Sequence, residues 1–293
     1  METGFYFAIV SAMAFAIAQV IVRKSTYRSG ESFTALAMTA LVGPPVFIIL
    51  LSALGEWDAF VSFSATQYVL LASAGLVHLI IARFLYFTST RVIGANPTAA
   101  ITRSSIVFSV ILGVVFLGET VTPWLVTGSI IIMVGSVMTS VDISRDTFRV
   151  SGPGLLMGFG TAIASATSAA LIRPVMQETD AVYAATFVMY LAAFAGMCLI
   201  LLASKRQRRT LALKERKTLL AFSAAGLVLV GGHLSRFAAL TDTPVSIVQP
   251  LIASTVVFVL LFSWIINRKI DVFNWQIIVG ILMVLAGVYM ITI

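Results

Sequence analysis

The stretch from Ser105 to Leu117 reads SIVFSVILGVVFL, with no charged residue and no alternation of polar and apolar positions. A transmembrane β-strand alternates in this way, whereas a helix that crosses the bilayer needs about 20 predominantly apolar residues. Similar runs fill the chain, because 59% of its 293 residues are hydrophobic and only 11% are charged. Its mean hydropathy is +1.04. The sequence therefore predicts an all-α integral membrane protein.

Ten apolar runs separated by short polar segments predict ten transmembrane helices. They cover about residues 4–22, 33–54, 66–87, 93–117, 121–140, 154–173, 181–203, 218–240, 245–266 and 273–292. Ten crossings use most of the chain and exclude a separate catalytic lobe. The one cysteine, Cys198, lies inside an apolar run, which predicts neither a disulfide nor a cysteine-based metal site.

Positive charge gathers in the connections that follow odd-numbered helices. These connections hold Arg23, Lys24, Arg28, Arg91, Arg145, Arg149, Lys205, Arg206, Arg208, Arg209, Lys214, Arg216, Lys217, Arg268 and Lys269. The other connections and the two termini together hold only Arg173. Cytoplasmic loops are enriched in Lys and Arg, so both termini are predicted to be extracytoplasmic, in the plasma or inner membrane of the cell. The net charge of +7 then reflects orientation and not nucleic-acid binding.

The sequence repeats itself weakly at an interval of about 150 residues. Gly4 and Arg23 recur as Gly154 and Arg173, and Arg83 and Pro97 recur as Arg236 and Pro250. The repeating unit contains five helices, an odd number, so its second copy enters the membrane from the opposite side. The sequence therefore predicts two inverted five-helix repeats, residues 1–150 and 151–293, as found in secondary transporters.

Each predicted half closes with an acidic residue, a tryptophan and two glycines. These are Glu119, Trp124, Gly128 and Gly135 in the first half, and Asp271, Trp275, Gly280 and Gly287 in the second. With ten helices in two halves, this pattern resembles the EamA-like members of the drug/metabolite transporter superfamily. The resemblance implies export or exchange of small metabolites, often amino acids, through a central cavity lined by both halves. It implies no particular substrate.

Five ionisable residues fall inside the predicted helices, and none of them is acidic: His78, Arg83, Arg103, His233 and Arg236. Ionisable residues at membrane depth usually face a cavity or a partner. In the superfamily that the chain resembles, small multidrug exporters bind cations and protons with a membrane-embedded carboxylate. The lack of such a carboxylate favours an anionic or zwitterionic substrate.

Arg103 is the strongest candidate for a substrate-binding residue. It lies about 16 Å inside the fourth predicted helix, too deep to snorkel easily. The predicted role is to clamp the negative group of the substrate, and the alternative is a structural arginine bound to carbonyls freed at Pro97. Arg103 has no counterpart in the second repeat, where Val256 takes its place.

Arg83 and Arg236 occupy equivalent positions in the two repeats, each about 7 Å from a predicted membrane face. One hypothesis makes them a pair of gates, with Arg83 near the cytoplasmic mouth and Arg236 near the external one. In the alternative, both side chains snorkel to the interface.

The equivalent pairs Asn96-Pro97 and Gln249-Pro250 are predicted to hinge two helices, because proline removes a backbone hydrogen bond. Prolines also occur in membrane helices for packing alone. Asn96 and Gln249 are predicted to bind the substrate together with Arg103. The other predicted members of this substrate site are His78, His233 and Tyr86. The histidines are candidate proton carriers or satisfied core residues, and Tyr86 alternatively belongs to the interfacial belt.

The sequence as a whole predicts a secondary transporter that exports small anionic or zwitterionic metabolites, such as amino acids, by alternating access. Its partners would be the substrate, the bilayer and protons as a candidate coupling ion, and the protein a monomer or homodimer. One alternative is an exporter of lipophilic cations or drugs, and another is a membrane-embedded lipid-modifying enzyme. No motif for an enzyme, a cofactor or a metal is found.

Overall fold

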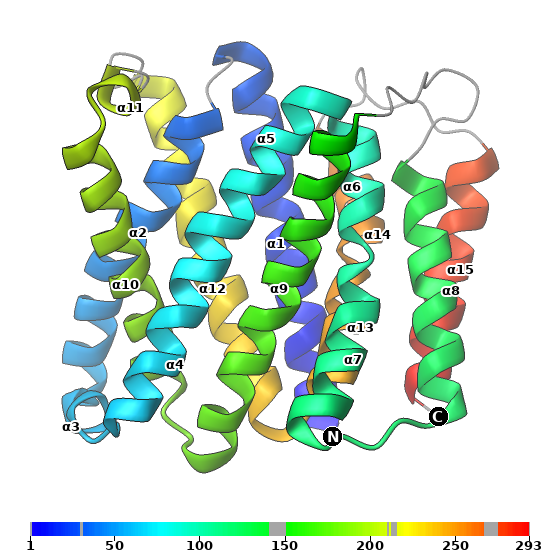
Figure 1. Ribbon diagram of the computed structural model, residues 1–293, viewed down its shortest axis with the longest axis horizontal. Coiled ribbons are helices and arrows are strands. Elements are labelled where there is room, and N and C mark those ends of the chain that lie inside the picture. The colour runs from blue at the N-terminus through cyan, green and yellow to red at the C-terminus, as the bar shows by residue number, and fades with distance from the viewer. Residues whose placement is uncertain are drawn as a thin grey trace.

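The computed structural model describes residues 2–29, 32–140, 151–209, 211, 216–266 and 275–292. Within these ranges every regular element is a helix. Nine of the helices found there are long and apolar enough to cross a membrane, and a shorter apolar helix covers Pro123–Thr139. The helices stand side by side in a bundle, with both termini at one end (Figure 1). The prediction of an all-α membrane protein built from ten helices is confirmed.

In the first half, the first two transmembrane helices are α1 (Glu2–Ser29) and α2 (Ser32–Leu54), and α3 (Trp57–Val61) is a short connection. The third consists of α4 (Ala65–Gly75), the π-helical η1 (Leu76–Ala82) and α5 (Arg83–Ile93). The fourth is broken into α6 (Ala95–Thr102) and α7 (Ser105–Leu117), and the fifth is α8 (Pro123–Ser140).

The second half begins with α9 (Gly152–Glu178) and α10 (Val182–Ala203), which are transmembrane helices six and seven, followed by the short α11 (Lys205–Arg209). Transmembrane helix eight is α12 (Arg216–Asp242). The ninth is broken into α13 (Val245–Ala253) and α14 (Thr255–Ile266), and the tenth is α15 (Trp275–Thr292). The fourth helix of each half is thus interrupted, whereas the π-helical segment occurs only in the first half of the described chain.

The helix contacts follow the repeat. α1 packs along α12, and its equivalent α9 packs along α4, η1 and α5. In the same way α1 contacts α13 and α14, while α9 contacts α6 and α7. α1 runs away from the end that carries the termini and α9 runs toward it (Figure 1). The two-repeat, inverted architecture is therefore confirmed, and the predicted boundary at residue 150 lies outside the described residues.

The glycines that close each half allow two helices to touch. A Cβ atom on Gly128 would lie 2.7 Å from the carbonyl oxygen of Gly287, and one on Gly135 would lie 2.6 Å from that of Gly280. The backbones of α8 and α15 therefore meet directly at both glycine pairs. Close packing of small residues is a main source of helix association in lipid, where apolar surface is not driven together by water.

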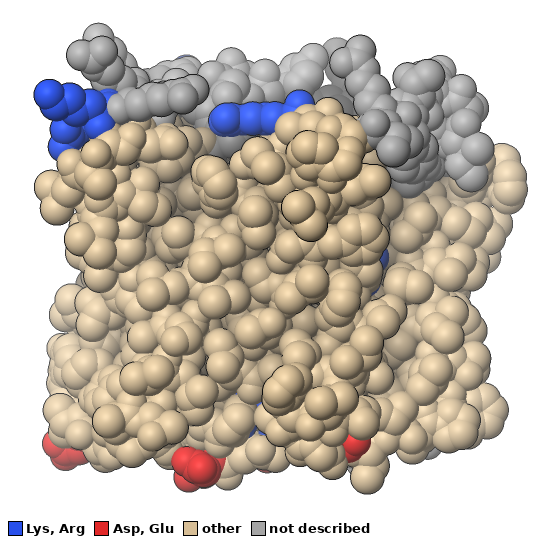
Figure 2. All heavy atoms as spheres, in the orientation of Figure 1, with Lys and Arg blue, Asp and Glu red and all other residues tan. Residues whose placement is uncertain are grey.

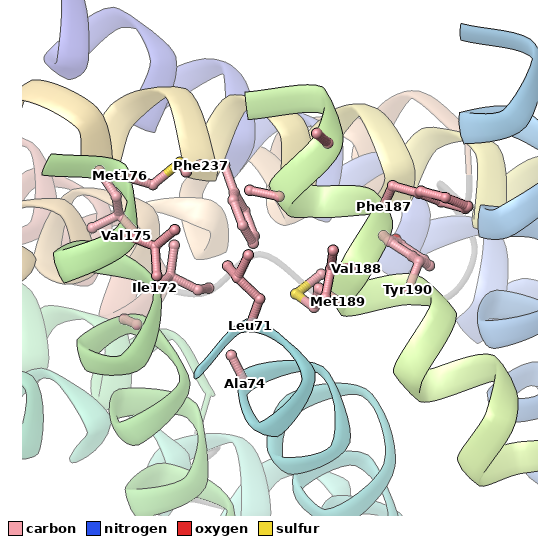
Figure 3. Close-up of a cluster of buried hydrophobic side chains, with 14 of the residues drawn as sticks. Leu71, Ala74, Ile172, Val175, Met176, Phe187, Val188, Met189, Tyr190 and Phe237 are labelled. Carbon is pink, nitrogen blue, oxygen red and sulfur yellow. The ribbon is translucent and has the colours of Figure 1, made fainter. Parts of the chain in front are cut away.

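A cluster of buried apolar side chains joins α4, α9, α10 and α12 (Figure 3). Leu71 of α4 lies between Ile172 of α9 and Met189 of α10, and Phe237 of α12 lies above it in the view. The cluster ties helices of both halves together and fixes the position of Tyr190, which borders it.

Charge is divided between the two ends of the bundle (Figure 2). On the face that Figure 2 shows, most of the visible Lys and Arg atoms lie at one end, and the Asp and Glu atoms lie at the other, which is the end with both termini. Arg145, Arg149, Lys214, Arg268 and Lys269 lie outside the described residues. The structure thus shows in space the asymmetry from which the orientation was predicted.

Candidate functional site

His78 lies in η1, a π-helical segment in the middle of the third transmembrane helix that the sequence analysis missed. A π-helical turn closes a hydrogen bond between residues i and i+5, and such turns are frequent at functional sites. His78 and Arg83 are separated by that interval. The wider turn therefore turns both residues toward one side of the helix, where an ordinary α-helix would separate them.

His78 and His233 come from different repeats and meet at the centre of this site. Their ring centroids lie 5.3 Å apart at an interplanar angle of 86°, and the Tyr190 ring lies 5.7 Å from that of His233. His233 is completely buried. Its two ring nitrogens and Nδ1 of His78 have no hydrogen-bond partner within the part of the chain that the structure describes. Buried polar groups normally have hydrogen-bond partners, so these nitrogens are available to bind a ligand.

Arg83 and Arg236 join the two histidines. The charges of both arginines act on both imidazole rings, so the equivalent residues of the two repeats converge on one site. Arg236 is only 2% exposed and its Nη2 atom donates one hydrogen bond of 3.4 Å to the carbonyl oxygen of Ser165 in α9. Its Nε atom has no partner among the described residues. The alternative that Arg236 snorkels to the interface is therefore wrong.

No described carboxylate acts on Arg83 or Arg236. Besides the two histidines, the phenol of Tyr190 interacts electrostatically with Arg83. The site is thus a group of two cations, two imidazoles and a phenol, drawn from transmembrane helices three, seven and eight. Such a group attracts anions, because guanidinium groups form strong, often bidentate hydrogen bonds to carboxylate and phosphate. Tyr190 was missed by sequence analysis, since one tyrosine in an apolar helix looks like a core residue.

Arg103 lies at the break between α6 and α7. Its backbone N–H bonds to the carbonyl oxygen of Ala100 and its own carbonyl accepts from Ile106, so the chain makes a tighter turn there. The Nε atom of Arg103 has no described partner, and its charge acts on Tyr86. Tyr86 lies one turn after Arg83 on α5, and residues three apart share a helix face. Arg103 therefore interacts electrostatically with Tyr86, another residue of the predicted substrate site, and Tyr86 lies one helical turn from Arg83.

The breaks in the fourth and ninth transmembrane helices share the same hydrogen-bond chemistry. Ser104 Oγ donates to the carbonyl oxygen of Ile101 at 2.7 Å, and Ser254 Oγ donates to that of Leu251 at 2.6 Å. Neighbouring threonines, Thr102 and Thr255, bond the carbonyls three residues before them in the same way. Hydroxyl groups thus add hydrogen bonds to backbone carbonyls at both helix breaks, where membrane-buried backbone needs partners within the protein.

The prediction of a kink at Pro97 is wrong about its position. Gly94, with a backbone φ of 96°, ends α5, and α6 begins at Ala95, so Pro97 falls in the first helical turn, where its missing N–H leaves no hydrogen bond unmade. The interruption lies further on, at Arg103 and Ser104. Pro250 does lie inside a helix, and the break follows it at Ser254. Whether either region hinges stays a prediction.

Of the two predicted amide residues, Gln249 and Asn96, the structure describes the side chain of Gln249. Gln249 lies on α13 and is buried, consistent with a position inside the bundle. The side chain of Asn96 lies outside the described residues. Their predicted contact with substrate stays a prediction.

A second polar group, at the end of the bundle with the termini, was missed by sequence analysis. Both carboxylate oxygens of Glu119 accept backbone N–H groups at the start of α13, from Val245 at 2.7 Å and Ser246 at 2.9 Å. Arg173, 7% exposed, donates from Nη1 to the carbonyl oxygens of Leu240 and Thr241 at the end of α12. Arg173 therefore lies inside α9 and not in the external connection where it was counted. Its sequence signals were its isolation among the acidic connections and its equivalence to Arg23 in the repeat.

No group of three His, Cys, Asp or Glu side chains in the described segments is placed to hold a metal ion. A groove at the basic end of the bundle is lined by Phe33, Leu36, Phe84, Phe87, Thr88, Arg91 and Gln207. It contains none of the predicted site residues.

Comparisons with known proteins bear on the fold and the family of the chain. A crystal structure of another protein superimposes with a TM-score of 0.79 and 16% sequence identity, covering 98% of this chain and 94% of that one, which shows a shared fold. Sequence comparison with curated proteins gives no match. The model of the EamA-like transporter family matches the chain twice, over residues 2–141 and 152–293, once for each repeat. The chain belongs to the EamA-like transporter family, within the drug/metabolite transporter superfamily.

Proposed function

We propose that this membrane transporter exports a small anionic or zwitterionic metabolite, such as an amino acid, by alternating access. The observation that carries the proposal is the group of Arg83, Arg236, His78 and His233, which come from both halves and on whose arginines no described carboxylate acts. An inverted repeat with a site at its interface is the arrangement by which secondary transporters expose one site to the two sides in turn.

In this proposal, Arg103 binds the negative group of the substrate. Arg103 lies at the helix break and interacts electrostatically with Tyr86, which lies on the same helix as Arg83, and these observations support the role. In transporters, broken helices supply the backbone and side-chain groups that bind substrate near the midplane. The matched breaks at Ser104 and Ser254 support this role.

The two alternatives predicted from the sequence receive less support. A transporter of lipophilic cations needs a buried carboxylate near its site, and the described carboxylate nearest to such a role, Glu119, already accepts two backbone hydrogen bonds. A lipid-modifying enzyme is disfavoured because the family model that matches both halves of the chain is that of a transporter family. We infer that the protein acts as a transporter and not as an enzyme.

We also propose that the basic end of the bundle is cytoplasmic and that both termini are extracytoplasmic. Single cysteines at Ser62 and Ser151, in a Cys198→Ser background, should react with a membrane-impermeant thiol reagent from opposite sides. Ser62 should react from outside and Ser151 from inside. Labelling of Ser62 from the cytoplasm alone would overturn the orientation.

Arg83 and Arg236 have matched gating parts in the proposal. Arg83→Ala should favour opening to the cytoplasm and Arg236→Ala opening to the outside, because the inverted repeat relates the two residues and each is proposed to restrain the side toward which its own half opens. Accessibility of cysteines placed at Ser165 and Ser254 reports the two states. Wild-type accessibility in both variants would refute gating.

The experiment that tests the transport function is a thermal-shift screen of the purified protein against a metabolite panel, followed by flux measurements in proteoliposomes with the stabilising compounds. We expect acidic or zwitterionic compounds to raise the melting temperature and to be transported. A dye that reports internal pH would show whether protons move with them, since the histidine pair makes protons a candidate coupling ion. If only lipophilic cations are transported, the proposed substrate class is wrong.

A further inference from the structure

The site between the repeats holds more positive charge than a zwitterion can neutralise. Arg83 and Arg236 stand at equivalent positions, 153 residues apart in the sequence, and both act on the pair formed by His78 and His233. Each repeat thus contributes one guanidinium to the same place. In the described part of the chain no carboxylate offsets either charge.

Removing a charged group from water is unfavourable unless a partner of opposite charge replaces the lost hydration. Arg236 is almost fully buried, and among the described residues it donates one long hydrogen bond, to the carbonyl oxygen of Ser165. At Arg173 and Glu119 of the same protein, by contrast, an opposite charge and several backbone groups act on the buried charge. The central site therefore has no acidic partner for its arginines among the described residues, and its ligand supplies the negative charge.

Three kinds of small solute fit this charge differently. A solute with one carboxylate leaves one guanidinium without a partner. A zwitterionic amino acid also carries an ammonium group, which would lie among arginines with no described carboxylate to receive it. A solute with two acidic groups offers each arginine its own anion, and each planar guanidinium can then grip a carboxylate with two parallel hydrogen bonds.

The uncharged groups of the site suit the same ligand. The phenol of Tyr190 and the imidazoles of His78 and His233 can each donate one hydrogen bond to a carboxylate oxygen. The unpartnered ring nitrogens of His233 are available for this purpose within the described structure. The two arginines belong to different helices, α5 and α12, which favours two separate acidic groups over one compact one.

Resting on the proposed transport function, we propose that the solute is a short dicarboxylate whose two carboxylates are held by Arg83 and Arg236, one from each repeat. The site selects against zwitterionic amino acids of the same length. Among the substrates that the transport proposal allows, this one neutralises both cations.

A matched set of ligands tests the inference on the unmodified full chain. Succinate, butyrate and 4-aminobutyrate share a four-carbon chain and differ in whether the second end is negative, neutral or positive. Thermal shift and competition in proteoliposomes are measured for this set and for the corresponding three- and five-carbon sets. We expect a dicarboxylate to bind about tenfold to a hundredfold more tightly than the matched monoacid, and the amino acid to bind most weakly.

Variants then connect the preference to the arginines. Arg83→Gln and Arg236→Gln should each reduce dicarboxylate binding to the level of the monoacid, while Arg83→Lys should keep part of the preference because the charge remains. Arg91→Gln is the matched control, an exposed arginine on the same helix as Arg83 and outside the site. It should bind as the wild type does.

The possible failures are distinct. If butyrate or an amino acid binds as tightly as its matched dicarboxylate, or if a phosphate monoester displaces every dicarboxylate, the inference is wrong while anion transport stands. If no dicarboxylate shifts the melting temperature or competes for flux, the inference is also wrong. If the proteoliposomes transport no anionic or zwitterionic solute at all, the proposed function fails with it.

Discussion

Two buried arginines of the second repeat have opposite surroundings. Arg173 donates to two backbone carbonyls at the end of α12, and the negative charges of Glu119 and Asp242 act on it. Among the described residues, Arg236 donates one long hydrogen bond, and the charged or titratable groups with which it interacts are the two histidines. Arg173 donates hydrogen bonds to carbonyl groups at the end of a helix, whereas no described carboxylate neutralises Arg236. In one protein, the same residue type thus serves structure at one place and is available to a ligand at another.

The comparison predicts that loss of Arg173 harms stability most. Arg173→Gln removes the charged donor from two carbonyls that lie away from water, at a cost of about 3 kcal/mol. The melting temperature of the purified protein should fall by several degrees. Substrate affinity, measured on the protein that stays folded, should be unchanged. An unchanged melting temperature would show that water replaces the guanidinium at the end of α12.

Arg103 should behave as a ligand-binding arginine. Arg103→Gln is expected to weaken substrate binding by about 1.5 to 3 kcal/mol, roughly tenfold to a hundredfold, because a charge-assisted hydrogen bond is lost. Arg103→Lys keeps the charge but not the planar fork and should fall between Gln and the wild type. Proteoliposome flux and a melting curve are recorded for each variant. Normal transport by the Gln variant, or loss of its fold, would favour the structural role.

Glu119 joins the two repeats through the start of α13, so its loss should affect stability to an intermediate extent. Glu119→Ala removes both acceptors from the first N–H groups of that helix, at a cost of about 1 to 2 kcal/mol. Glu119→Gln keeps an oxygen acceptor and should recover part of the loss. Thermal unfolding of the three proteins checks this order. Equal stability of the Ala variant and the wild type would contradict the capping role.

The smallest expected effect concerns two glycines with different surroundings. A Cβ on Gly135 would meet the backbone of α15, whereas one on Gly231 would meet nothing within 4 Å. Gly135→Ala should therefore destabilise the protein by about 1 to 2 kcal/mol through strain between α8 and α15. Gly231→Ala should be neutral or stabilising by up to about 1 kcal/mol, since alanine favours the helix. Melting temperatures that move in the same direction would refute the close helix contact.

The features that follow from hydropathy, charge and repetition were predictable from the sequence. The ten helices, the inverted repeat and the gathering of positive charge at one end are confirmed, because each depends on many residues that act in the same sense. The equal spacing of Arg83 and Arg236 also indicated that they matter together, although not that both reach the same two histidines.

Features that depend on local geometry were not predictable. The π-helical segment around His78 has no sequence signature, and it changes which side chains share a face. Proline suggested a kink at Pro97, but its place in the first turn makes it harmless there, and the break falls at Arg103 and Ser104 instead. The contacts of Tyr190, Glu119 and Arg173 join residues far apart in the chain, so only the folded structure shows them.

The central claim is that the open charge of Arg236 binds the transported anion. The most direct test measures flux and melting temperature of Arg236→Gln side by side with Arg91→Gln and the wild type. Removing a buried charge that lacks a counter-ion should leave the melting temperature equal or higher, while flux of the anionic substrate falls by about a hundredfold. Arg91→Gln should match the wild type in both measurements. If Arg236→Gln transports the anion normally, or if it unfolds as Arg173→Gln is expected to, Arg236 is a structural residue and the claim is wrong.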